Sequence, residues 1–130
     1  MFVDTSALVA MLSSENGAEQ LAGRLSHASS PLTSPIAIFE TVLALRRKYE
    51  APLSDALHDT LGFLVQARVQ VEEIRSDSHL LAIAAHERYG KGRGHPAQLN
   101  MGDCFSYAMA KAHGVPLLYT GEDFRKTDLA

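Results

Sequence analysis

The sequence predicts an α/β protein with a mainly parallel sheet that helices cover on both faces. Short apolar runs bounded by turn residues alternate with segments whose apolar residues recur at helical spacing. Such alternation indicates βαβ units, whose crossover helices pack on the two faces of a parallel sheet. The 130 residues suit one domain and contain no repeat or low-complexity segment. We therefore expect residues 1–130 to form a single domain.

The first half of the chain predicts two short strands and four helices. Asp4 or Ser6 can cap the first helix, and Pro35 suits the first turn of the third. In chain order, the predicted elements are a strand over 1–4, helices over 5–12 and 15–28, a strand over 31–35, a helix from 35 to about 49, and a helix from Pro52. The predicted core face of this last helix comprises Ala56, Leu57, Leu61, Leu64 and Val65.

The second half predicts two more strands and two more helices. Asn100 is a suitable N-cap for the second of these helices, and Gly114 suits the position just beyond its end. Glycines and cations between the two helices predict a loop. In chain order, these elements are a strand over 69–74, a helix over 77–89, the loop 90–96, a helix from 100 to about 113, and a strand from Pro116.

Four acidic residues occupy positions where burial or apolar neighbours are expected: Asp4, Glu40, Asp103 and Asp123. Asp4 and Asp123 follow strands, and ligand sites of parallel sheets form beyond the carboxyl ends of strands. Glu40 and Asp103 lie on helices that can reach that edge. A buried carboxylate needs a cationic partner, yet no Lys or Arg lies within three residues of the first three acids. We therefore predict a divalent-metal site, for which carboxylates favour Mg²⁺ or Mn²⁺.

Three of these acids also have a simple structural explanation when each is taken alone. Asp4 can cap a helix, Asp103 can be the third-position acid of a capping box, and Asp123 can be a turn residue. Glu40 has no such explanation. It lies on the same helix face as Ile36 and Leu43, and we predict that this face is buried. A single metal site accounts for all four acids together.

Composition argues against several other classes of protein. One cysteine excludes an internal disulfide, and six histidines without an HxxxH pair disfavour zinc. Asp4 interrupts the apolar N-terminus, which we interpret as a strand and not a signal peptide, and no run is long enough to span a bilayer. The expected location is cytoplasmic. The net charge of −3 weakly disfavours nucleic acid as a partner. If bound metal neutralises the four acids, however, the net charge of the rest of the chain is slightly positive.

Four segments together resemble the motifs of PIN domains, in particular VapC-type toxins. Residues Met1–Leu8 resemble the opening of a PIN domain, and Ser34-Pro35 followed by Glu40 resembles the helix of the second acid. Residues Leu99–Lys111 are similar to the third-acid motif, and Leu117–Leu129 to the C-terminal motif. The resemblance covers essentially the whole chain, in order and spacing.

The resemblance implies a Rossmann-like α/β/α sandwich, a homodimer and an endoribonuclease that depends on Mg²⁺ or Mn²⁺. Such an enzyme is usually the toxin of a VapBC pair and is inhibited by its cognate VapB-like antitoxin. A bound metal would activate water for attack on RNA, and the expected products carry 5′-phosphate and 3′-hydroxyl ends. Two alternatives remain open: a PIN nuclease that acts without an antitoxin, on RNA processing or on DNA, and a non-catalytic PIN-fold binding module.

By position, the resemblance makes Asp4, Glu40 and Asp103 catalytic metal ligands. Asp123 is the expected fourth acid, although Asp128 lies in the same matching tail; Asp123 is preferred because it is nearer the end of the strand. The resemblance also implies substrate-binding roles for two hydroxyl residues that border the site, Ser6 and Thr120.

Surface features have less specific interpretations. The loop 90–96 lacks the P-loop pattern and is either a solvated loop or an RNA-backbone contact. Residues 46–48 are either a solvated helical face or, at Arg46, a contact to RNA or to an acidic antitoxin residue. The helical hairpin over 36–69 has enough Leu and Val for a groove that binds a partner helix. Phe39 is expected to be a core or dimer contact rather than a platform for base stacking.

Overall fold

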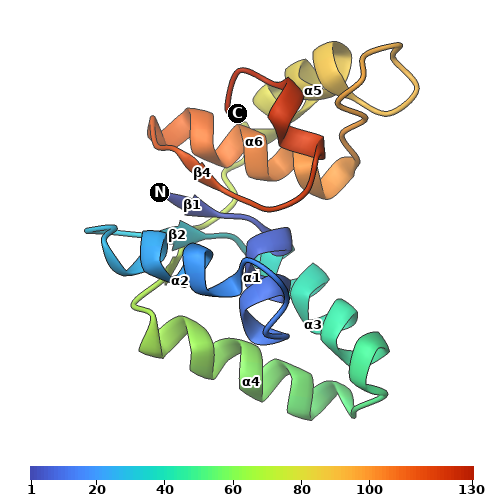
Figure 1. Ribbon diagram of the computed structural model, residues 1–130. Helices are drawn as coiled ribbons and strands as arrows, with labels where there is room; N and C mark the ends of the chain where they lie inside the picture. Colours follow the sequence, from blue (N-terminus) through green and yellow to red (C-terminus); the bar gives the residue numbers. More distant parts are fainter.

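The computed structural model describes all 130 residues and contains one parallel sheet between two layers of helices (Figure 1). The strand order is β3-β2-β1-β4, and every pairing is parallel. Phe2 lies opposite Leu32 on one neighbouring strand and Leu117 on the other. The strands are β1 (Phe2–Val3), β2 (Leu32–Thr33), β3 (Gln70–Val71) and β4 (Leu117–Leu118).

Six α-helices and one short 3₁₀ helix complete the fold. Helices α5 and α6 lie on one side of the sheet, and α1 to α4 lie on the other (Figure 1). None of the helices combines the length and the apolar character needed to cross a membrane. The helices are α1 (Thr5–Leu12), α2 (Ala18–Ser26), α3 (Pro35–Tyr49), α4 (Leu53–Gln66), α5 (Ser78–Tyr89), α6 (Met101–His113) and the 3₁₀ helix η1 (Asp123–Lys126).

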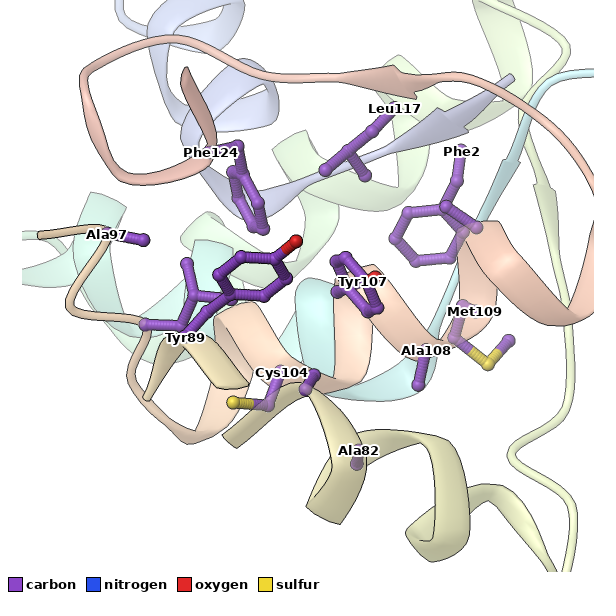
Figure 2. Packing of buried hydrophobic residues seen from close by; sticks show 13 residues of the cluster. Phe2, Ala82, Tyr89, Ala97, Cys104, Tyr107, Ala108, Met109, Leu117 and Phe124 are labelled. Atoms are coloured by element: carbon purple, nitrogen blue, oxygen red, sulfur yellow. The ribbon is translucent and has the colours of Figure 1, made fainter. Parts of the chain in front are cut away.

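Strands β1 and β4 each contribute side chains to two separate cores. Phe2 and Leu117 pack with residues of α5 and α6, and Figure 2 shows them beside Tyr107. Val3 and Leu118 point to the other face and pack with residues of α1, α2 and α4. Successive side chains of a strand alternate between faces, so β1 and β4 each connect the two layers. The predicted α/β class, with helices on both faces of a parallel sheet, is confirmed.

The predicted elements all occur, with shorter strands and shifted ends. Helix α2 begins at Ala18 instead of residue 15, because Ser14 and Gly17 take left-handed backbone angles with φ of 50° and 88°. Strand β3 is confined to Gln70–Val71 instead of 69–74. It is an edge strand that pairs only with β2, and because β2 ends at Thr33 the pairing stops after the hydrogen bond from Glu72 N to Thr33 O.

The predicted core faces of α3 and α4 are partly wrong. The stripe of α4 that is buried includes Thr60, which the hydrophobic pattern does not identify. Phe39 of α3 is 64% exposed and is therefore no core residue. These two helices pack on each other along one stripe and have no further layer outside them. The apolar residues of α4 that remain exposed are Leu53, Leu57, Leu61 and Val65.

Candidate active site

The four predicted acids lie on elements that meet at the carboxyl edge of the sheet. Asp4 directly follows β1, Asp123 opens η1 after β4, and Glu40 and Asp103 come from α3 and α6. Glu40 accepts a hydrogen bond from Thr5, the neighbour of Asp4, and its carboxylate lies against Gly102, the neighbour of Asp103. The charges of Asp4, Asp123 and Glu40 all help to raise the pKa of Asp103. The fold therefore brings together residues that are up to about 120 positions apart in the chain.

Asp4 is held in place by the first turn of α1. Its side chain is 2% exposed, and its Oδ2 accepts hydrogen bonds from Ser6 N at 2.9 Å and Ser6 Oγ at 2.6 Å. The backbone N–H of Thr120 donates to Ser6 Oγ at 3.1 Å. Asp4 is thus the N-cap of α1, and no protein group donates to its second oxygen, Oδ1. Capping leaves this oxygen available for another ligand.

Glu40 is oriented by Thr5 and closely packed against α6. The Thr5 hydroxyl donates to Glu40 Oε1 at 2.9 Å. A Cβ added at Gly102 would overlap both carboxylate oxygens of Glu40, so any side chain at this position would force the Glu40 carboxylate to move. Neither Thr5 nor Gly102 is among the site residues that the sequence predicts. Thr5 follows Asp4 directly, but nothing in the sequence connects it with a glutamate 35 positions away.

The helix face that carries Glu40 is not buried, contrary to prediction. Glu40 is half-buried, and Leu43 is 36% exposed. Burial raises the pKa of Glu40, the Thr5 hydrogen bond opposes this increase, and the charge of Asp4 adds to it. The face borders an open groove beside the site, so solvent reaches Glu40.

Asp103 is both a helix cap and a member of the acidic site. Asn100 Oδ1 accepts from Asp103 N at 2.9 Å, and Asp103 Oδ2 accepts from Asn100 N at 3.1 Å, which completes a capping box. Burial raises the pKa of Asp103 to about 7 against the opposing hydrogen bond from Asn100, and the charges of Asp4, Asp123 and Glu40 raise it further. The cap orients this carboxylate without neutralising it.

Asp123 and Asp128 have different surroundings, although they lie in the same tail motif. Asp123 is exposed at the start of η1 and adds to the negative field on Asp103. Asp128 instead accepts hydrogen bonds from Lys111 Nζ at 2.6 Å and from Tyr107 Oη at 2.7 Å. Burial opposes the change, but Lys111 and Tyr107 lower the pKa of Asp128. Asp128 therefore already has a cationic partner.

None of the four site acids forms an ion pair with a Lys or Arg. Carboxylate and hydroxyl oxygens are the donors that hard divalent cations prefer, so the residues present suit Mg²⁺ or Mn²⁺. No three Asp, Glu, His or Cys side chains already surround one ion position. Mg²⁺ usually keeps several waters and takes one or two carboxylates directly, which suits acids that are close without being in contact.

Comparison with known proteins identifies the class of fold and site. Residues 1–129 match the family model of the PIN domain, and the chain therefore belongs to the PIN-domain family. A VapC ribonuclease of Rhizobium meliloti is 45% identical over an alignment of 140 residues, and this alignment covers 98% of each chain. Ribonuclease VapC30 of Mycobacterium tuberculosis is 43% identical over 130 residues, which cover 100% of this chain and 96% of that one. The resemblance to VapC-type PIN domains is confirmed.

Solved structures agree on the fold. The crystal structure of Mycobacterium tuberculosis VapC20, described as a toxin that cleaves the sarcin-ricin loop, superposes with a TM-score of 0.72 at 22% identity. It covers 95% of this chain and 92% of its own. A toxin–antitoxin complex from Klebsiella pneumoniae has a TM-score of 0.68 at 18% identity, covering 98% and 92% of the two chains. At these identities the likeness concerns the fold alone.

Proposed function

We propose that this chain is an endoribonuclease and the toxin of a toxin–antitoxin pair. The observation that supports this function best is the set of acids without a cationic partner at the strand ends, within a chain that matches VapC ribonucleases along its length. Metal-assisted cleavage of a phosphodiester needs such a set, because carboxylates hold the cations that neutralise the phosphate and the leaving oxygen. A non-catalytic binding module has no need to keep these mutually repelling charges.

Asp4, Glu40 and Asp103 would hold Mg²⁺ or Mn²⁺, with Asp123 as the fourth acid. When bound, the ion supplies Lewis-acid activation of water and of the scissile phosphate. Ser6 orients Asp4 through two hydrogen bonds. The backbone N–H of Thr120 donates to Ser6 Oγ, which keeps the two residues adjacent. Their hydroxyls would position a phosphate oxygen or a metal-bound water.

Two supporting residues act through Glu40. The Thr5 hydroxyl fixes one of its carboxylate oxygens, and the absence of a side chain at Gly102 leaves room for both. In the absence of cations the four acids repel one another and any phosphate. The site is therefore expected to bind RNA weakly until a metal is bound.

The antitoxin would bind the groove of about 480 Å³ between α3 and α4. No charged residue lines this groove, and exposed leucines of α4, among them Leu53 and Leu57, form its outer wall. An amphipathic helix buries its apolar face in such a groove. Arg46, exposed on α3 without an ion-pair partner, is available to an acidic residue of that helix.

The family resemblance also implies a homodimer. Light scattering tests this prediction, since a homodimer would have twice the mass of the single chain.

The direct test compares wild type with Asp4→Asn on labelled RNA in the presence of Mg²⁺ or Mn²⁺. Asn caps helices as well as Asp does, so Asp4→Asn should fold normally and cleave no RNA. Asp59→Asn makes the same chemical change on the exposed surface of α4 and is the matched control, with wild-type cleavage expected. EDTA should stop cleavage by wild type, and added Mg²⁺ should raise its Tm but not that of Asp4→Asn.

Three results would contradict the proposal. Cleavage by Asp4→Asn at the wild-type rate would exclude the acidic site as the catalytic centre. Cleavage that survives EDTA would exclude the metal. Absence of growth arrest when wild type is expressed in cells, together with cleavage in vitro, would favour a processing nuclease over a toxin.

A further inference from the structure

A second groove, of about 490 Å³, leads away from the acidic site along α3. Glu40 belongs to both, so the groove opens directly onto the site. Phe39 and Leu43 form one wall, and Met101, at the start of α6, belongs to the opposite wall. Arg47 lines the far end.

The groove follows one face of α3. Glu40, Leu43 and Arg47 are spaced i, i+3 and i+7, which places them on the same side of the helix. With a rise of 1.5 Å per residue, Arg47 lies about 10 Å along the axis from Glu40. Arg47 takes part in no ion pair, whereas Lys48, the next residue, is bound to Glu15 at 3.2 Å. The Arg47 guanidinium, which has no ion-pair partner, thus lies near the site at which we propose that a phosphodiester is cleaved.

The walls of the groove carry large apolar side chains that the fold leaves uncovered. Phe39 is 64% exposed and Met101 is 68% exposed. Proteins that bind single-stranded nucleic acid combine exposed aromatic rings, on which bases stack, with cations along the backbone. Phe39 and Arg47 provide these two groups on one groove.

We propose that this groove binds the RNA strand on one side of the scissile phosphate. Phe39 is the platform for a base next to the cleavage site, and Arg47 pairs with a phosphate farther along the strand. Met101 is the apolar edge that confines the base. The inference rests on the proposed ribonuclease activity and adds to it a binding surface with specificity-determining residues outside the acidic site.

This groove differs in its charged residues from the antitoxin groove on the other side of Phe39. Both grooves share Phe39 and Leu43 as a common ridge. Only the groove next to the acidic site contains charged residues, Glu40 and Arg47. A nucleic-acid strand needs a cation and an opening to the catalytic acids, whereas an apolar helix face needs neither. The groove that contains Arg47 therefore suits RNA better than a protein helix.

The test measures binding of a short fluorescent single-stranded RNA of mixed sequence by anisotropy, with Mg²⁺ present. The Asp4→Asn protein is the parent of every variant: it leaves the RNA intact, and the loss of one carboxylate reduces the repulsion of phosphate by the metal-free site. Adding Phe39→Ala should raise Kd about tenfold, since stacking on an aromatic side chain is lost. Phe39→Tyr should bind as well as the parent, and Phe39→Leu should bind as poorly as Phe39→Ala, because leucine keeps the bulk but not the ring.

The phosphate contact is tested by salt dependence. Arg47→Gln should lower the slope of log K against log salt by about 0.7, the value for one phosphate contact on a single strand. Arg24→Gln removes an exposed charge on α2 that has no ion-pair partner and lies outside the groove, and it should leave the slope unchanged. Both positions are exposed, so wild-type Tm values are expected for both variants.

The results also separate this inference from the proposed activity. Parental Kd and salt slope for Phe39→Ala and Arg47→Gln would overturn the RNA groove even if wild type cleaves RNA, and would assign the ridge to a protein partner. Parental binding by Phe39→Leu would overturn the stacking role. If wild type cleaves no RNA but binding still depends on Phe39 and Arg47, the groove stands and the proposed activity fails.

Discussion

Asp103 belongs to helix α6 and Asp128 contacts that helix, yet their surroundings shift the pKa of the two carboxylates in opposite directions. Burial and three neighbouring acids raise the pKa of Asp103 to about 7. Around Asp128, Lys111 and two tyrosine hydroxyls, those of Tyr89 and Tyr107, donate to its oxygens. They lower its pKa despite the effect of burial. The first environment leaves negative charge unbalanced, and the second balances it.

This difference indicates which acids serve function and which serve stability. A carboxylate with a cation and hydrogen-bond donors stabilises the fold when it is ionised. A group of carboxylates without a cation destabilises the fold until a ligand brings one. Asp128 thus ties the C-terminal segment to α5 and α6, whereas Asp103 belongs to a site that needs a metal. Substitutions of the two acids should therefore affect different properties.

The largest expected difference is in catalysis. Asp103→Asn should lower kcat/KM for RNA by about 10³-fold or more, since a metal ligand is lost. Asp128→Asn should stay within about threefold of wild type, because Asp128 lies outside the site. Initial rates of cleavage, measured for both variants with Mg²⁺, test this difference. A larger loss for Asp128→Asn than for Asp103→Asn would reverse the two assignments.

For the free energy of unfolding, substitution of Asp128 should have the clear effect, and this effect is smaller than the catalytic effect of substituting Asp103. Asp128→Ala should cost about 1–2 kcal/mol of unfolding free energy, because hydrogen bonds to a charged, partly exposed group are lost. Glu122→Ala also removes an acid from an ion pair of the same tail, with Arg125, but that pair is 66–70% exposed. It should cost less than about 0.5 kcal/mol. Urea denaturation measures both values, and equal costs would show that the Asp128 network does not hold the tail.

A third expected difference is in the pH dependence of stability without metal. The raised pKa of Asp103 means that the folded state holds a proton that the unfolded state releases between its ordinary pKa, 3.8, and about 7. Stability should therefore fall as pH rises through this interval. Asp103→Asn removes this titration, so in EDTA its Tm should equal that of wild type near pH 4 and exceed it increasingly as the pH rises to 7.

Asp128 should show the reverse pH dependence. Its lowered pKa means that the contribution of Asp128 to stability is complete above pH 4 and is lost at more acidic pH. The Tm difference between wild type and Asp128→Asn should accordingly shrink below pH 4.

The prediction for Asp103 has its own contradicting outcome. Parallel Tm curves for wild type and Asp103→Asn in EDTA from pH 4 to 8 would contradict the unbalanced charge at Asp103.

Much of the fold and the candidate site could be predicted, because the relevant signals are local. Asp4 directly follows an apolar run, and Asn100 with Asp103 has the spacing of a capping box, so both were found from a few neighbouring residues. The parallel sheet followed from the alternation of strands and helices. Thr5 and Gly102 could not be predicted as neighbours of Glu40, because these contacts join parts of the chain that only packing brings together.

The sequence alone determined the α/β class, the PIN-domain family and the acids that follow strands or open helices. These features depend on residue type and on spacing within one element, which are local. The tertiary structure decided the partner of each acid: Asp128 meets Lys111, whereas Asp123 adds to the field on Asp103. It also decided that the Phe39 side of α3 is open instead of buried. Burial and electrostatic partners depend on distances between distant residues, and these distances exist only once the chain has packed.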